Sequence, residues 1–286
     1  MLFLEQNGLR VSILDPVEDQ ARQGCRYCVG GYVWQVEDKT KGPLLTGPWH
    51  PDPNPHPFHG QGLPEAFEIA LGQHRARVGE DVYVIGVGRV KRESPIEPFH
   101  VRNNFTVAEF AAWKVGVEPD TVTMVSEQSF QEWSLHLTRT VRLRGRVLES
   151  ATLIRNTGSA ELPIRWFAHP FFPPGELECF AFSRPCAFPA WVPDAGGFRW
   201  NERGFVERKA DYDWTKGCFQ LVMAPFGYPL DVSVRHPLLG EIKAECRFPV
   251  AWLPIWGNDR TISFEPYHHT VVLPGGNSEW LIRYGF

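Results

Sequence analysis

Hydrophobic and polar residues alternate with a period of two through much of this chain. Within residues 133–143, the odd positions are almost all apolar and the even positions are polar. Successive side chains of a strand point to opposite faces, so this pattern predicts a long strand with one buried face. A second alternating run, residues 147–156, follows Arg144-Gly145-Arg146, and the two runs together predict a β-hairpin.

The same pattern continues toward the C-terminus. Residues 162–172 form the next predicted strand after a turn at 156–159, and a last strand over 279–286 follows the turn at 274–277. The one predicted helix, Val107–Val115, is short, and 25 prolines with 26 glycines leave little room for long helices. We therefore expect an all-β fold, a large antiparallel β-sandwich with few short helices, in which residues 1–286 form a single domain.

Composition and charge narrow the function classes. A net charge of −4 at pH 7 gives no electrostatic case for binding nucleic acid or anionic membranes. Three of the arginines at 139, 142, 144 and 146 share one parity, which favours a solvated sheet face. No stretch approaches the ~18 consecutive apolar residues of a spanning helix, and Met1–Leu14 does not resemble a secretory signal. We expect a cytoplasmic protein, a monomer or homodimer.

Cysteine and histidine clusters raise the question of a metal or redox site. Cys25-Arg26-Tyr27-Cys28 has no second cysteine pair at zinc-site spacing, so reduced structural thiols are expected. His50, His56 and His59 share a Pro-rich loop, residues 42–62, which is more typical of a long functional loop than of a linker. A metal-dependent hydrolase built on these histidines is an alternative, but we expect neither metal nor organic cofactor.

Two strings 96 positions apart carry the candidate chemistry. One ionisable side chain interrupts each apolar run, namely His169 in residues 165–172 and Glu265 in residues 262–267. Strand parity places His169 opposite the face of Trp166, and Glu265 opposite the face of Phe264. A histidine and a carboxylate that converge can supply an acid and a base to one substrate, as the opening of a sugar hemiacetal requires. The alternatives are a core histidine and an exposed strand carboxylate.

These strings resemble two signatures of the galactose mutarotase (aldose 1-epimerase) superfamily. The histidine followed by an aromatic pair, His169-Pro170-Phe171-Phe172, resembles the segment of the family's general acid. Phe264-Glu265-Pro266 near the end of the chain resembles the segment of its general base, and His59-Gly60 resembles that of its first substrate-binding histidine. The resemblance runs from about residue 25 to the end, and it implies a galactose mutarotase-like supersandwich with Glu265 and His169 as catalytic residues.

Some features depart from the family pattern. No arginine lies between Arg26 and Arg75, where the family carries one, and Asp211, Asp213 and Asp231 are equal candidates for its substrate-binding aspartate. The motif Phe58–Phe67 is distinctive, and within it Gln61 and Glu65 are candidate ligands of sugar hydroxyls. The alternative for Glu65 is a carboxylate that braces the loop.

The function that this resemblance implies is aldose 1-epimerase activity on a small-molecule sugar. Two alternatives share the fold. A hexose-6-phosphate 1-epimerase would need basic residues at the rim of the cleft, for which Arg26, Arg89 and Arg165 are candidates. A non-catalytic carbohydrate-binding protein would need no acid–base pair.

Overall fold

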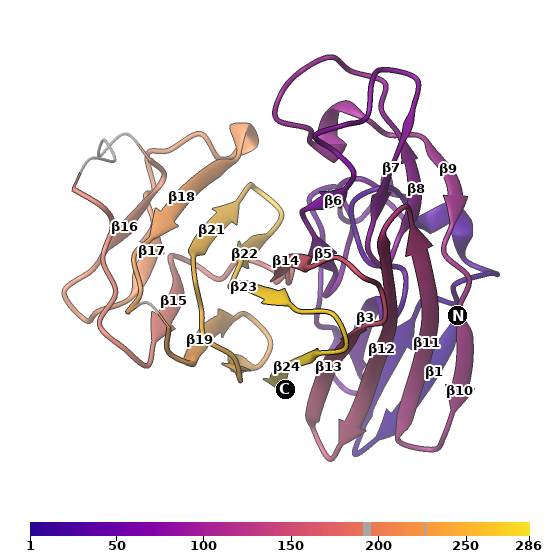
Figure 1. Cartoon of the computed structure of the whole chain (residues 1–286). Coiled ribbons are helices and arrows are strands. Elements are labelled where there is room, and N and C mark those ends of the chain that lie inside the picture. The colour runs from indigo at the N-terminus through magenta and orange to yellow at the C-terminus, as the bar shows by residue number, and fades with distance from the viewer. Residues whose placement is uncertain (191–195, 226) are drawn as a thin grey trace.

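Strands make up most of the computed structural model, which describes residues 1–190, 196–225 and 227–286. In these ranges the strands pair into five antiparallel sheets (Figure 1). The helices there are three short 3₁₀ helices, η1 (Gln20–Arg22), η2 (Val101–Asn103) and η3 (Trp214–Lys216). None of the helices in the described ranges has the length and apolarity needed to cross a membrane. The prediction of an all-β fold with few short helices is confirmed.

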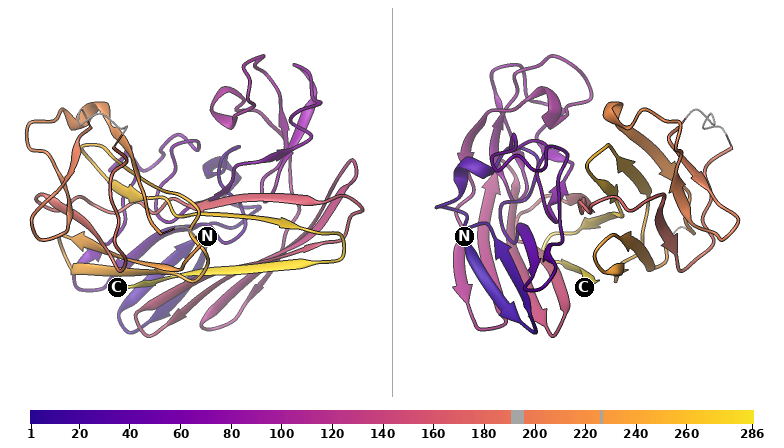
Figure 2. Two further views of the ribbon diagram at one scale, coloured as in Figure 1. Left: turned by 60° about the vertical axis from the view of Figure 1, so that its left-hand side comes forward. Right: turned by 180° about the vertical axis from the view of Figure 1, so that it is seen from behind.

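The largest sheet forms the base of the molecule and runs through both of its halves (Figure 2). The predicted hairpin is present in it, because the two long central strands pair across a turn at Gly145. In spatial order its strands are β10 (Lys114–Val117), β11 (Thr121–Phe130), β12 (Trp133–Arg144), β13 (Val147–Asn156), β24 (Asn277–Gly285), β20 (Gly240–Cys246), β19 (Leu230–His236), β15 (Glu178–Phe182), β17 (Val206–Arg208) and β16 (Phe198–Trp200).

Four smaller sheets complete the fold. Aromatic residues in the core connect one of these sheets to the large sheet: the ring centroid of Trp166, in β14 (Leu162–Ala168), lies 5.6 Å from that of Trp280 in β24. The first sheet contains β1 (Leu2–Gln6), β2 (Leu9–Ile13), β3 (Val33–Asp38) and β4 (Gly42–Pro43). The others are β23 (Tyr267–Val272), β14 (Leu162–Ala168) and β5 (Glu65–Phe67); β18 (Cys218–Val222), β21 (Leu253–Gly257) and β22 (Ile262–Phe264); and β6 (Ala70–Leu71), β7 (Asp81–Val84), β8 (Gly88–Lys91) and β9 (Val107–Phe110).

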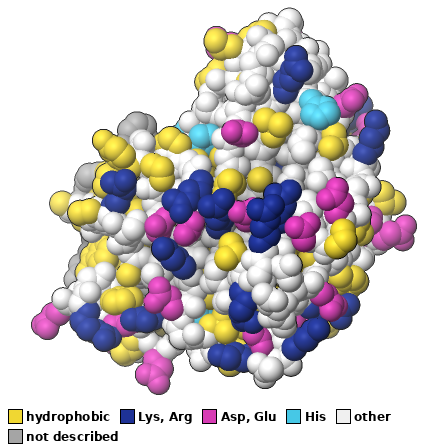
Figure 3. Space-filling model, turned by 90° about the horizontal axis from the view of Figure 1, so that it is seen from below, with side chains coloured by type: hydrophobic (Ala, Val, Ile, Leu, Met, Phe, Trp, Pro, Cys, Tyr) yellow, Lys and Arg dark blue, Asp and Glu magenta, His cyan; other side chains and the backbone are white. Residues whose placement is uncertain are grey.

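Charges of both signs are interspersed over the face seen from below in Figure 3. Ion pairs also join neighbouring strands of the large sheet, for example Arg283 Nε of β24 and Glu149 Oε1 of β13 at 2.6 Å. Exposed pairs of this kind each contribute only about 0–1 kcal/mol, so the stability of the sheet rests on its buried face.

The predicted helix over Val107–Val115 is wrong. This segment contributes to two edge strands, β9 and β10, which pair with β8 and β11. Between them, Trp113 packs against Gly30, where a Cβ would lie 2.3 Å from the indole ring. Pairing with open sheet edges therefore determines the conformation of this segment.

Arg139 is buried, whereas Arg142, Arg144 and Arg146, which share the opposite parity and the expected solvated face, occupy intermediate or exposed positions. Arg139 occupies an inward position of β12, is 1% exposed, and forms an ion pair with Glu65 of β5, with 2.5 Å between Nη2 and Oε2. Ser150 and Trp166 donate further hydrogen bonds to the same carboxylate. Burial of a charge requires such pairing, so this network ties β5 to the large sheet.

Removal of the arginine should destabilise the fold strongly. We expect Arg139→Met to lower the free energy of unfolding by about 3–5 kcal/mol, because Glu65 is left buried and unpaired. Urea denaturation measures the change, with Arg144→Met at an exposed position of the same strand as the control. Adding Glu65→Gln to Arg139→Met should recover part of the loss, and a double variant no more stable than the single one would contradict this account.

Candidate active site

Strand register brings His169 and Glu265 together. Phe167 pairs with Tyr267 where β14 meets β23, and Phe172 pairs with Ile262 in the same register farther along. His169 and Glu265 occupy opposite positions between these two pairs. Pro170 and Pro266 follow them directly and have no N–H to donate, so the hydrogen-bond ladder is interrupted here. The predicted strand over 162–172 accordingly ends at Ala168.

The two side chains meet end to end in a buried position. His169 Nε2 lies 3.5 Å from Glu265 Oε1, and the residues are 4% and 5% exposed. Burial raises the pKa of Glu265 to about 7 and holds the pKa of His169 well below its usual value. As the pH falls through about 7 the pair therefore takes up one proton, and burial favours the placement of this proton on Glu265.

Both side chains line a cleft of about 530 Å³. Strand parity is as predicted, since Phe167 and His169 line this cleft while Trp166 packs in the core. One set of lining residues is aromatic and includes Tyr267, Trp252, Trp256 and Phe219; another is basic and includes Arg26, His59, His100 and Arg102. Flat aromatic rings suit the C–H faces of a sugar ring, and the basic groups suit hydroxyl or anionic oxygens.

The loop that carries His59 is fixed beside His169 by backbone hydrogen bonds. The N–H of His169 donates to the carbonyl of Pro64 at 2.8 Å, and Phe171 donates to Gly62 at 2.8 Å. Gly62 has φ +79°, and a Cβ there would lie 2.4 Å from the Val33 carbonyl oxygen, so the close approach of the loop requires glycine. His59 thereby reaches the cleft from a distant part of the sequence.

Gln61 and Glu65 lie outside this cleft. The carboxylate of Glu65 is 4% exposed and bonded to Arg139, Ser150 and Trp166, which fits the alternative of a bracing role. Gln61 is also buried, and its backbone N–H donates to the hydroxyl of Tyr32 at 3.1 Å. Neither side chain is among the lining residues. The motif fixes the loop, and its members that line the cleft are Phe58, His59, Ala66 and Phe67.

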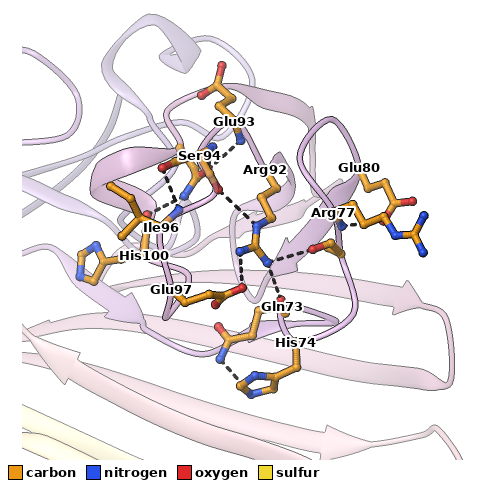
Figure 4. A network of polar contacts seen from close by, with 12 residues as sticks. Gln73, His74, Arg77, Glu80, Arg92, Glu93, Ser94, Ile96, Glu97 and His100 are labelled. Atoms are coloured by element: carbon orange, nitrogen blue, oxygen red, sulfur yellow. Dashed lines mark hydrogen bonds and ion pairs between the residues drawn. The ribbon is translucent and has the colours of Figure 1, made fainter.

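A second loop brings His100 and Arg102 to the cleft. Arg92, just after β8, anchors the start of this loop: its guanidinium donates to the carbonyls of Gln73, Ala76 and Ser94 and pairs with Glu97 (Figure 4). The nearby Asn104 side chain accepts from the backbone N–H groups of Glu93 and Ser94. The sequence carries no sign of this contribution, because the loop has no motif.

Other sequence candidates divide between the cleft and the rest of the surface. Arg26 lines the cleft, whereas Arg89 lines a different groove and Arg165 pairs with Glu68 at 3.4 Å. Glu68 was not predicted, although it lies one residue beyond the Phe58–Phe67 motif. Asp211, Asp213 and Asp231 are not among the lining residues. Among the described residues no group of three or more His, Cys, Asp or Glu side chains is arranged to hold a metal ion.

Comparison with known proteins identifies the fold. No family model and no curated protein matches the sequence. A galactose mutarotase related enzyme from Lactobacillus acidophilus is 14% identical with a TM-score of 0.62, over 99% of this chain and 96% of that one. A galactose mutarotase-like protein from Lactobacillus casei is 13% identical with a TM-score of 0.60, over 100% of this chain and 99% of that one. A galactose mutarotase-like protein from Clostridium acetobutylicum is 14% identical with a TM-score of 0.55, over 99% of this chain and 93% of that one. The chain has the galactose mutarotase-like fold, as predicted.

Proposed function

We propose that this protein is an isomerase of the aldose 1-epimerase type, which interconverts the α and β anomers of an aldohexose. The observation that carries the proposal is the buried pair of His169 Nε2 and Glu265 Oε1, 3.5 Å apart in an open cleft. The names of the solved structures with the same fold agree with it.

The pair can supply the one proton donor and the one proton acceptor that ring opening requires. With Glu265 ionised and His169 protonated, the carboxylate takes the proton of the anomeric hydroxyl while the imidazolium donates to the ring oxygen. The ring C–O bond breaks, and the open aldehyde forms beside a protonated Glu265 and a neutral His169. Rotation about C1–C2 presents the other carbonyl face, and reversal of both transfers closes the ring. Acid–base catalysis of this kind contributes about 10²–10⁴-fold.

The two proton arrangements of the pair are the start and the end of the opening step. Burial favours the second arrangement in the free protein, with the proton on Glu265. The positive charge of Arg26 lowers the pKa of both groups, so it favours release of the proton from the pair rather than one of the two arrangements. His59, Trp256 and Tyr267 line the cleft, which supports a role for His59 in binding a hydroxyl or the ring oxygen and for the two aromatic rings in contacting the sugar.

The rate should depend on pH through this single proton. We expect kcat/KM to fall as pH rises above about 7, because the pair then loses its proton from Glu265. On the acid side the rate should hold until the pH falls through the lowered pKa of His169, where the pair gains a second proton. Initial rates across pH 4–9, corrected for the spontaneous reaction, measure the profile; a rate that increases steadily above pH 7 would contradict it.

A sugar phosphate is the second candidate substrate, favoured by the basic lining of the cleft. Arg26 and Arg102 contribute two guanidinium groups beside His59 and His100. Guanidinium groups bind phosphate oxygens in a bidentate manner, which suits a hexose 6-phosphate.

The deciding experiment is the rate of anomer interconversion, measured by polarimetry or NMR exchange. The panel contains glucose, galactose, other aldoses and glucose 6-phosphate, with Glu265→Gln as the control. Acceleration of a free hexose that vanishes in the variant supports the first substrate class, and acceleration confined to the phosphate supports the second. Binding without acceleration would overturn the enzyme proposal in favour of a carbohydrate-binding protein.

A further inference from the structure

The imidazole of His169 is enclosed by aromatic rings and has one polar contact at each nitrogen. Its ring centroid lies 4.4 Å from that of Phe171, 6.2 Å from Tyr27 and 6.3 Å from Trp256. Nε2 faces Glu265 at the cleft, and Nδ1 lies 2.7 Å from the hydroxyl of Ser263. The orientation of the ring within this apolar enclosure therefore depends on the hydroxyl behind it.

Ser263, the hydrogen-bond partner of His169 Nδ1, is held in a fully buried position. It is 0% exposed, and β22 holds it in place by pairing it with Trp256 of β21. Within the described part of the chain, the hydrogen bond with His169 is the one that its side chain makes. A buried hydroxyl with a single partner loses free energy if that partner turns away, so the contact fixes both groups.

We propose that Ser263 is a positioning residue, which holds Nδ1 of His169 so that Nε2 alone exchanges the proton with the sugar. This inference rests on the proposed epimerase function. The hydroxyl reaches no substrate atom in this arrangement and acts through the imidazole.

A hydroxyl suits this position better than the carboxylate that supports histidine in many other sites. A hydroxyl donates to an unprotonated Nδ1 and accepts from a protonated one, so it remains bonded whichever nitrogen of the ring carries hydrogen. It adds no negative charge, whereas a carboxylate would raise the pKa of His169 and retain its proton. The hydroxyl thus orients the imidazole without raising its pKa as a carboxylate would, so the imidazolium can still release its proton.

Substitution of the hydroxyl tests the inference. We expect Ser263→Ala to lower kcat by about 10- to 100-fold, the worth of a hydrogen bond to a group that becomes charged, with KM changed less than threefold. Ser263→Thr keeps the hydroxyl and should restore most of kcat. The matched control is Thr261→Val, which removes another fully buried hydroxyl, bonded to Thr46 and Phe172, from a neighbouring position. Loss of kcat in the control equal to that in Ser263→Ala would overturn the inference.

A second measurement does not depend on activity. The ¹⁵N chemical shifts of the His169 ring, assigned by their absence in His169→Gln, report which nitrogen carries hydrogen at each pH. We expect Ser263→Ala to change the tautomer ratio and the pKa of His169, and Thr261→Val to leave both unchanged. Ser263→Cys, with its weak hydrogen bond, replaces the alanine variant if that one does not fold. Unchanged shifts in the Ser263 variants would overturn the inference, whereas changed shifts in a protein that accelerates no sugar would overturn the epimerase function alone.

Discussion

Glu265→Gln should abolish anomer interconversion while leaving sugar affinity within a few-fold of the wild type. The amide keeps the size and hydrogen-bonding capacity of the carboxylate but cannot take a proton from the anomeric hydroxyl. The loss should be about 10²–10⁴-fold, the usual contribution of acid–base catalysis. Polarimetry on the sugar with the highest wild-type rate measures turnover, and quenching of the cleft tryptophans measures binding.

The matched control is Glu68→Gln, which neutralises a second carboxylate lining the same cleft. Glu68 pairs with Arg165, whereas Glu265 is the carboxylate that pairs with His169. We expect this variant to retain at least a tenth of the wild-type rate. Wild-type turnover in Glu265→Gln, or equal losses in the two variants, would show that the base lies elsewhere.

The orientation of the proposed acid–base pair was predictable from the sequence in large part. Parity alone assigned Phe167 and His169 to the face opposite Trp166, and this face lines the cleft. The prolines after His169 and Glu265 follow the ends of β14 and β22, although the predicted strand over 162–172 ran past the first of them. The distance between the two side chains was not predictable, because it depends on the register of β14 against β23, and no local pattern encodes the pairing of residues a hundred positions apart.

Buried charge was the principal source of error. Arg139 breaks the apolar alternation of its strand at an inward position, and the parity argument that assigned Arg142, Arg144 and Arg146 to a solvated face gave this break no meaning. The carboxylate that compensates it, Glu65, lies 74 residues earlier in the chain and resembled a sugar ligand because it adjoins His59. A residue that is close in sequence to a site residue need not point its side chain toward the site. Successive side chains of a strand point alternately to opposite faces, here toward the cleft and toward the core.

The basic residues of the cleft show a second limit. Arg26 was a candidate on composition alone, and Arg102 was not considered, since it enters from the loop before β9 that Arg92 anchors. Long-range loop placement follows from tertiary hydrogen bonds, which carry no periodic signature. The proposed choice between a free hexose and a sugar phosphate rests on these two side chains, so it could not be made from motifs.

His169→Gln should invert the pH dependence as well as lower the rate. At neutral pH we expect turnover to fall by about 10²–10⁴-fold, because the ring oxygen loses its proton donor while the glutamine amide keeps a polar group in the enclosure. The residual reaction depends on Glu265 as a base, and the ionised fraction of Glu265 increases as pH rises through its pKa of about 7. The residual rate should therefore rise and level off over the range in which the wild-type rate declines. Rates of both proteins from pH 5 to 9 in the same buffers measure this. A variant whose rate declines above pH 7 like that of the wild type would show that the proton lost there is not shared with His169.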